Sequence, residues 1–268
     1  MGQPTPASPV QYSAPPPAYE ETAPLVTNHD HDTSGADQTN EDVPDDFKYG
    51  TTVGQCDREV RFAFIRKVYA ILTAQLLFTT VLGGVFMLNS SVQAWIMHHV
   101  WSMYVAVGAS LVTLLVLMWK RRSYPLNFAL LALFTLCEAA TIGFVVSLYD
   151  SRLVLQALLL TLGIFVALTL FTLQSSYDFS RLGPVLGFAL WGIILVGFIQ
   201  IFFPFNRTFD LVMAIVTAVI FCGYIVYDTH AITHRLSPDE YIAAAVELYL
   251  DVINLFIALL RILSDSRE

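Results

Sequence analysis

Charged residues are scarce in this sequence. Only 13% of its 268 residues are Asp, Glu, Lys or Arg, whereas 56% are hydrophobic. A water-soluble domain of this length could not hide so much apolar surface from water. The scarcity of charge therefore excludes an ordinary soluble globular protein and indicates that lipid surrounds most of the chain.

Basic residues and cysteines are scarcer still. The chain has 14 Lys and Arg against 22 Asp and Glu, a net charge of −8, which excludes a basic nucleic-acid-binding surface. Its cysteines, Cys56, Cys137 and Cys222, are widely spaced and two lie in apolar runs. This spacing predicts neither a disulfide framework nor a cysteine metal site.

Apolar periodicity is absent from the first part of the chain. Residues 1–55 are rich in Pro, Thr, Ser, Asp and Asn, so they cannot bury enough surface to offset the entropy of ordering. We expect them to form a disordered tail. Because the tail has no stretch of signal-peptide type, we expect the first membrane span to act as the targeting signal.

Long apolar runs dominate the remainder, residues 56–268. About 20 apolar residues, rising about 1.5 Å each, match a hydrocarbon core of about 30 Å. Because lipid offers no partner to backbone amides, each such run should be a helix. Seven runs qualify: 68–88, 100–119, 125–149, 153–173, 183–203, 211–232 and 241–263. The sequence thus predicts an all-α membrane protein with seven transmembrane helices and short connections.

Lys and Arg near the spans predict the orientation of the chain in the membrane. They cluster just before the first span and between the second and third spans, whereas the connection between the first and second spans has none. The positive-inside rule therefore places the amino terminus in the cytosol.

A few ionisable residues lie inside the apolar runs. Placing such a residue in the membrane costs free energy, so each of them is a functional candidate. Glu138 lies in the middle of the third span and Asp228 late in the sixth. In the last span, Glu247, Asp251 and Asn254 recur at intervals of four and three, followed by Arg261, which places them on one helix face. That face should avoid lipid. The alternative is that this segment is only an interfacial amphipathic helix.

Asp228 and Asp251 could face each other across the last two spans. Ser237-Pro238-Asp239-Glu240 has the pattern of a capping box, which predicts that the last helix starts at Ser237. Straight antiparallel helices would then leave the two aspartates about 8 Å apart along the helix axis, so their meeting needs tilt or an irregular connection. Two carboxylates in contact cannot comfortably both be ionised, so such a pair would respond to pH.

Two motifs in these spans resemble the transmembrane Bax inhibitor motif family. They are the segments 223–229 (GYIVYDT) and 247–256 (ELYLDVINLF). The segment 61–69 at the first span, Gln75-Leu76 and Glu138 resemble the Lifeguard branch of that family. The resemblance covers about residues 57–264 and leaves the tail outside.

The resemblance implies both a fold and a function. The fold is two groups of three helices around a central seventh. The function is a pH-dependent calcium leak of an internal membrane (endoplasmic reticulum, Golgi or vacuole) that regulates cell death. It implies no enzymatic activity and no cofactor, with calcium as the transported ion and cell-death regulators of the Bcl-2 type as partners. Asp228 and Asp251 would form the pH sensor, with Arg121 as counter-ion to Asp228 and with Glu138, Glu247 and Asn254 in support.

The tail carries two short motifs of its own. Pro16-Pro17-Ala18-Tyr19 is a PPxY element, whose prolines favour the extended helix that WW domains bind, so we expect a WW-domain ubiquitin ligase as a partner. The segment 21–26 (ETAPLV) approximates an acidic dileucine sorting signal, with Val in place of the second leucine.

Other functions stay open at this point. His230 and His234 are spaced i, i+4 near Asp228, which suits a zinc ion in an intramembrane metal hydrolase, although a third ligand at that depth is not evident. A membrane scaffold acting through its tail is a further alternative. A seven-helix receptor is disfavoured by the basic amino-terminal flank.

Overall fold

The structure is a computed structural model that describes residues 52–203 and 206–266. The predicted PPxY and sorting motifs, and nearly all of the predicted disordered tail, lie outside these residues. Helices make up the described part: α1 (Arg58–Leu88), α2 (Ser90–His98), α3 (Trp101–Lys120), α4 (Leu126–Val146), α5 (Ser151–Gln174), α6 (Leu182–Phe202), α7 (Arg207–His234) and α8 (Tyr241–Asp265). Three 3₁₀ turns accompany them: η2 (Val53–Gln55), η3 (Phe179–Arg181) and η4 (Pro238–Glu240).

The seven predicted spans are confirmed. Within the described residues, seven helices are long and apolar enough to cross a membrane, and they correspond to α1 and α3 to α8. The chain is therefore a multi-pass membrane protein. One helix was not predicted: α2 lies between the first two spans, and its first turn is capped by Asn89, whose side-chain oxygen accepts the N–H groups of Ser91 and Val92.

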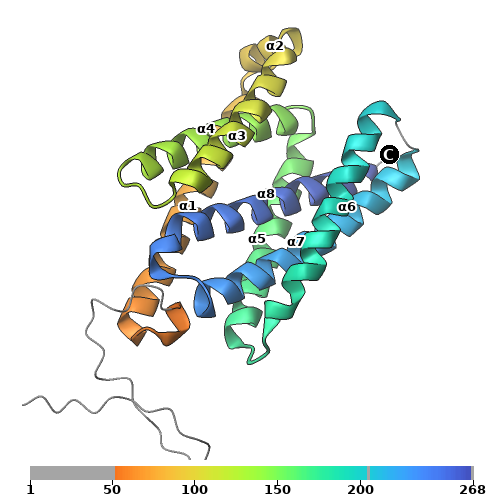
Figure 1. Cartoon of the computed structure of the whole chain (residues 1–268). Helices are drawn as coiled ribbons and strands as arrows, with labels where there is room; N and C mark the ends of the chain where they lie inside the picture. The colour runs from red at the N-terminus through yellow and green to blue at the C-terminus, as the bar shows by residue number, and fades with distance from the viewer. Residues whose placement is uncertain (1–51, 204–205, 267–268) are drawn as a thin grey trace, which may run out of the picture. The chain divides into compact units, whose positions relative to one another are not determined.

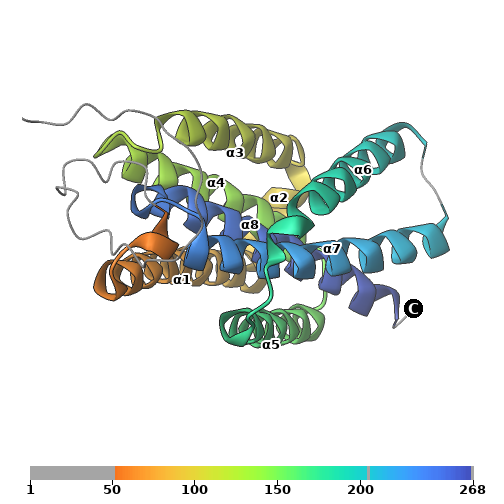
Figure 2. The same cartoon turned by 60° about the horizontal axis from the view of Figure 1, so that its bottom comes forward.

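Helix α8 lies at the centre of the bundle, with α1, α3 and α4 on one side and α5, α6 and α7 on the other (Figures 1 and 2). In its most apolar stretch 78% of the residues are buried, against 6% for the span that contains α6. The predicted arrangement of two three-helix groups around a seventh helix is thus confirmed. The alternative of an interfacial last helix is wrong, because the apolar residues of α8 face protein on nearly every side.

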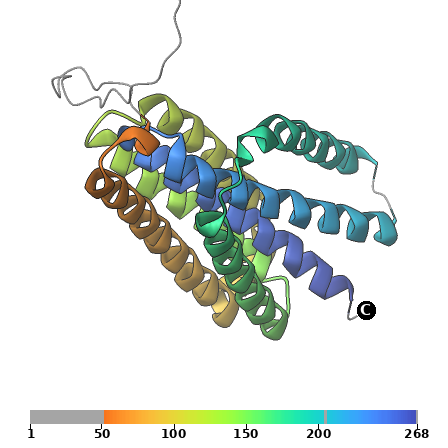
Figure 3. The same cartoon turned by 90° about the horizontal axis from the view of Figure 1, so that it is seen from below.

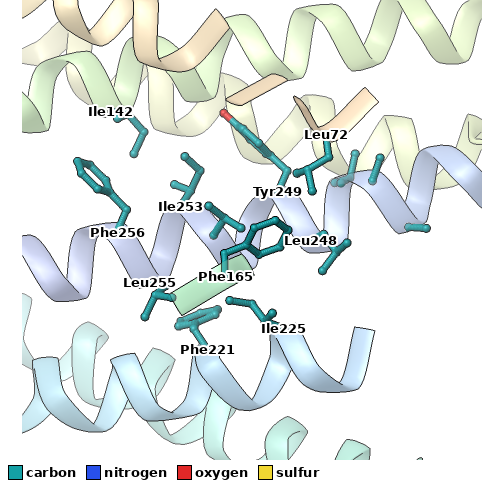
Figure 4. Close-up of a cluster of buried hydrophobic side chains, with 14 of the residues drawn as sticks. Leu72, Ile142, Phe165, Phe221, Ile225, Leu248, Tyr249, Ile253, Leu255 and Phe256 are labelled. Atoms are coloured by element: carbon teal, nitrogen blue, oxygen red, sulfur yellow. The ribbon is translucent and has the colours of Figure 1, made fainter. Parts of the chain in front are cut away.

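Small residues allow the other helices to approach α8. Ala243, Ala244 and Ala245 are buried in its first turns, where a larger side chain would hold the neighbouring helices apart. Further along, large side chains fill the space: Figure 4 shows Phe221 and Ile225 of α7 and Phe165 of α5 against α8. Tyr249 points to the opposite side of α8, toward the first helix group.

Helix α6 has the most exposed surface of the seven spans. Its large side chains, Phe188, Trp191 and Phe198 among them, are more than half exposed, which suits a lipid-facing helix. It packs on α7, and two glycines bring the helices together. A Cβ atom on Gly183 would lie 2.9 Å from the Tyr227 hydroxyl, and one on Gly223 would lie 2.9 Å from Leu186.

The connection between α7 and α8 differs from the predicted capping box. The Ser237 side chain makes no capping hydrogen bond, and the α-helix begins at Tyr241, after the 3₁₀ turn η4. The carboxylate that a capping box would use, Glu240, instead binds two arginines of another connection. The end of α7 is closed by its own backbone, because the N–H groups of Arg235 and Leu236 both donate to the Ala231 carbonyl.

The segment that precedes α1 packs against this same connection. The Val53 N–H donates to the Leu236 carbonyl at 2.8 Å, and the Val53 side chain is fully buried. A Cβ atom on Gly54 would lie 2.8 Å from the backbone oxygen of His234. Glycine is therefore required for this close approach.

We expect Gly54→Ala to destabilise the protein by about 1–3 kcal/mol, because the added methyl group must push the α7 backbone away from η2. The measurement is thermal unfolding in detergent micelles. Gly108→Ala in α3 is the matched control: a Cβ atom there meets nothing within 4 Å, so this change should be neutral or stabilising. Equal shifts of the melting temperature in the two variants would contradict the close approach.

Candidate functional site

Asp228 of α7 and Asp251 of α8 meet in the interior of the bundle. They are 8% and 5% exposed, and their carboxyl groups lie within hydrogen-bonding reach of each other. A carboxylate can only accept hydrogen bonds, so a bond between two carboxyl groups requires a proton on one of them. A hydrogen bond between Asp228 and Asp251 would therefore hold one proton at membrane depth.

The inclination of the two helices makes this contact possible. If α7 and α8 were straight and antiparallel, the two aspartates would lie at different depths along the helix axis, because they are at unequal distances in sequence from the connection between the helices. Figure 3 shows α7 and α8 inclined to each other. The inclination brings the late part of α7 against the middle of α8.

A cavity of about 390 Å³ adjoins the pair on the side of the α7–α8 connection. Its lining residues are Tyr224, Tyr227, Asp228, Ala231, Arg235, Leu236 and Glu247. Glu247 lies about one helical turn before Asp251, and its carboxylate is exposed in this cavity. Two acidic side chains therefore face one polar space at the edge of the bundle.

A second polar cavity, of about 420 Å³, lies at the other end of α7 and α8. It is lined by Tyr149, Gln200, Arg207, Asp210, Leu211, Ala214, Arg261, Ser264 and Asp265. Here Arg207 of α7 forms an ion pair with Asp265 of α8. The predicted polar face of α8 runs from Glu247 in the first cavity, past Asp251, to Arg261 in the second.

Asn254 lies on this face between the aspartate pair and the second cavity. Its side-chain amide donates to the Leu250 carbonyl of its own helix at 2.8 Å, and the residue is half-buried. It therefore keeps a polar group within the apolar part of the bundle.

Arg121 does not take the predicted place beside Asp228. Its guanidinium binds Glu240 at 3.0 Å, and Arg122 binds the same carboxylate oxygen at 3.2 Å. The connection after α3 is held by Asn127, whose side chain donates to the Arg121 carbonyl at 3.0 Å. In this conformation Glu240, at the start of α8, is the partner of Arg121, so the role of Arg121 as counter-ion to Asp228 stays a prediction.

Glu138 belongs to a different polar cluster. It accepts a hydrogen bond of 2.5 Å from Ser110 of α3, on the side of α8 away from α7. Two further pairs lie on this side of α8: Gln75 donates to Thr135 at 2.9 Å, and the hydroxyl of Thr79 lies 2.8 Å from that of Tyr249 of α8. The i, i+4 spacing of Gln75 and Thr79 is the signal in the sequence that could have revealed a polar face on α1.

The two histidines of α7 stack on each other, with ring centroids 4.6 Å apart. His230 Nε2 lies 3.7 Å from Asp178, and His234 Nδ1 lies 2.7 Å from the Thr233 hydroxyl. The hydroxyl and the N–H of Ser180, which donate to Asp178, and the nearby His230 hold the pKa of that carboxyl below its usual value. Among the residues that the structure describes, no three His, Cys, Asp or Glu side chains are grouped to hold a metal ion.

The shared proton gives a spectroscopic prediction. The infrared spectrum at neutral pH should contain the carbonyl band of a protonated carboxyl group, and Asp251→Asn or Asp228→Asn should remove it. The spectra are best recorded in a background that carries both Glu138→Gln and Glu247→Gln, because these are two further acids at membrane depth. Asp210→Asn, which removes an exposed acid from the far end of α7, should leave the band in place. A band that survives both aspartate variants would show that the pair holds no proton.

Comparison with known proteins identifies the family. The family model described as "Inhibitor of apoptosis-promoting Bax1" matches residues 61–268. Bax inhibitor 1 of Schizosaccharomyces pombe is 47% identical over 82% of this chain and 82% of its own length. Protein lifeguard 4 of Mus musculus is 43% identical over 82% of this chain and 92% of its own length.

A viral protein is similar to the same extent. The Golgi anti-apoptotic protein of Vaccinia virus (strain Lister) is 43% identical over 84% of this chain and 95% of its own length. These relatives, the family match and the seven spans around a central α8 agree with the resemblance drawn from segments 223–229 and 247–256. The chain belongs to the Bax inhibitor family of multi-pass membrane proteins.

Proposed function

We propose that this protein is a pH-sensitive calcium leak channel of an internal membrane that restrains programmed cell death. The observation that carries the proposal is the buried carboxyl pair of Asp228 and Asp251 beside a polar cavity. Ionisable groups at membrane depth are costly and mark ion or proton pathways. Calcium prefers carboxylate and other oxygen ligands, which this pair and Glu247 supply.

The polar face of α8 supports a path along the α7–α8 interface. Glu247 opens onto one cavity and Arg261 onto the other, with Asp251 and Asn254 between them. Phe221 and Leu255 are buried in the apolar contacts between the same helices (Figure 4). An ion that passes would have to separate these side chains, so the described conformation is a closed one.

The carboxyl pair supplies a gate that responds to protons. While the carboxyl groups share a proton, their hydrogen bond holds α7 against α8. When that proton leaves, two negative charges face each other in a poorly solvated place and repel. The same step frees the carboxylate oxygens for a cation. Proton binding and calcium passage are thus coupled at one contact.

The names of the relatives support the cell-death role and an internal membrane. The viral relative is named as a Golgi anti-apoptotic protein and the yeast relative as a Bax inhibitor. The basic residues before α1 and after α3 support an amino terminus in the cytosol. In that orientation the PPxY element of the tail would be open to WW-domain ligases, and the protein could meet regulators of the Bcl-2 type.

The test is calcium flux from proteoliposomes that contain the purified protein. Flux should change between about pH 6 and pH 8, as the pair exchanges its shared proton. Asp228→Asn and Asp251→Asn should abolish this pH response, because an amide cannot take part in the exchange. Glu138→Gln is the matched control: it removes an acid at similar depth, bound to Ser110, and should leave the pH response intact. The channel mechanism fails if both aspartate variants keep the wild-type pH response.

A further inference from the structure

Cationic side chains from two parts of the chain converge on the start of α8. Lys67 of α1 places its ammonium group 3.3 Å from the ring centroid of Tyr241. Arg121 and Arg122, which follow α3, bind the Glu240 carboxylate at 3.0 and 3.2 Å. We call Lys67, Arg121 and Arg122 the basic cluster; none of them belongs to the carboxyl site between α7 and α8.

The basic cluster carries more positive charge than its partner neutralises. Arg121 and Arg122 share one carboxylate, that of Glu240, whose side chain is only 16% exposed, and Lys67 lies over the ring of the next residue, Tyr241. The Arg121 and Arg122 side chains remain 39% and 66% exposed. Each guanidinium has five N–H donors, so donors remain after the bond to Glu240. The cluster can therefore bind an anion from outside the protein.

Aromatic side chains place the cluster at the level of the lipid headgroups. Trp119 and Tyr124, on either side of the two arginines in sequence, are 80% and 79% exposed. Trp and Tyr on a membrane protein concentrate where the hydrocarbon core meets water. Lys120 lies 5.0 Å from the Trp119 ring, which keeps another cation at this level. The anion within reach is thus the phosphate of a lipid in the adjoining leaflet.

We propose that the basic cluster binds the phosphorylated headgroup of an anionic lipid. Guanidinium groups bind phosphate oxygens in pairs, as they bind carboxylates, so the headgroup would compete with Glu240 for Arg121 and Arg122. Lys67 adds a third charge from α1. A headgroup carrying several phosphates fits this cluster best, because Arg121 and Arg122 share one weakly exposed acid and Lys67 lies over the neighbouring Tyr241 ring.

This competition would affect α8, the helix that carries Asp251. The Glu240 carboxylate ties the start of α8 to the connection after α3, and a phosphate in its place would release that tie. Lipid binding would therefore change how α8 is held at one end. The binding itself does not depend on calcium passage, so it can be tested whether or not the channel proposal holds.

The test is native mass spectrometry of the full chain, released from nanodiscs containing phosphatidylcholine with a small share of phosphatidylinositol bisphosphate. Wild-type protein should retain the phosphoinositide. Arg122→Gln and Lys67→Gln should each weaken retention about fivefold, the expected effect of one basic residue near an anionic headgroup. Arg58→Gln is the matched control, since Arg58 is exposed on α1 nine residues before Lys67. If Arg58→Gln weakened phosphoinositide retention equally, the loss would be an effect of general surface charge. That result would contradict a binding site at the basic cluster.

A second pair of variants tests the competition with Glu240. Glu240→Gln should strengthen phosphoinositide retention about fivefold, because it frees both arginines. Asp239→Asn removes the same charge from the exposed neighbouring residue and should have a much smaller effect. Equal effects of the two variants would contradict a direct exchange of carboxylate for phosphate. Soluble inositol trisphosphate should displace the lipid only weakly; displacement at equal concentration would assign the cluster to a soluble phosphate and overturn the lipid proposal.

Discussion

Two carboxyl groups in contact at membrane depth determine much of this architecture. Neither Asp228 nor Asp251 can face lipid, and a hydrogen bond between them exists only while one holds a proton. Both helices must therefore be shielded from lipid where they meet. The bundle achieves this by surrounding α8, whose alanines at 243–245 let neighbouring helices close in and whose large residues fill the space further along. The outer helices, α6 above all, then supply the lipid-facing surface.

The spans and the central place of α8 followed from the sequence because each depends on a local property. A run of about 20 apolar residues has one stable form in lipid. The polar face formed by Glu247, Asp251 and Asn254 required that the last helix be enclosed by protein. The family motifs then supplied the grouping of the other six helices, which periodicity alone could not.

The features that the sequence did not predict depend on contacts between distant segments. Arg121 was expected beside Asp228, but in the structure it binds Glu240, which lies in the turn η4. The capping box of Ser237 does not form, because Arg121 and Arg122 engage the Glu240 carboxylate and the Glu240 N–H donates to the Ser237 carbonyl. The helix α2 escaped prediction because it is short and begins with an Asn cap, a signal also found in turns. Its nine residues lie beside α1, outside the seven apolar runs of spanning length.

The contacts that hold α8 differ in how they respond to charge. At one end Glu240 binds Arg121 and Arg122, and at the other Asp265 binds Arg207. Both contacts are strongest when every partner is ionised. The contact between the carboxyl groups of Asp228 and Asp251 has the opposite dependence on charge. It is favourable only while a proton neutralises one of the two groups. Loss of that proton would therefore release the middle of the α7–α8 interface while the ion pair of Arg207 with Asp265 stays in place. In the proposed channel, the motion that follows is a local parting of two helices around a fixed end, and Gly223, packed against Leu186, lies on the part of α7 that would have to move.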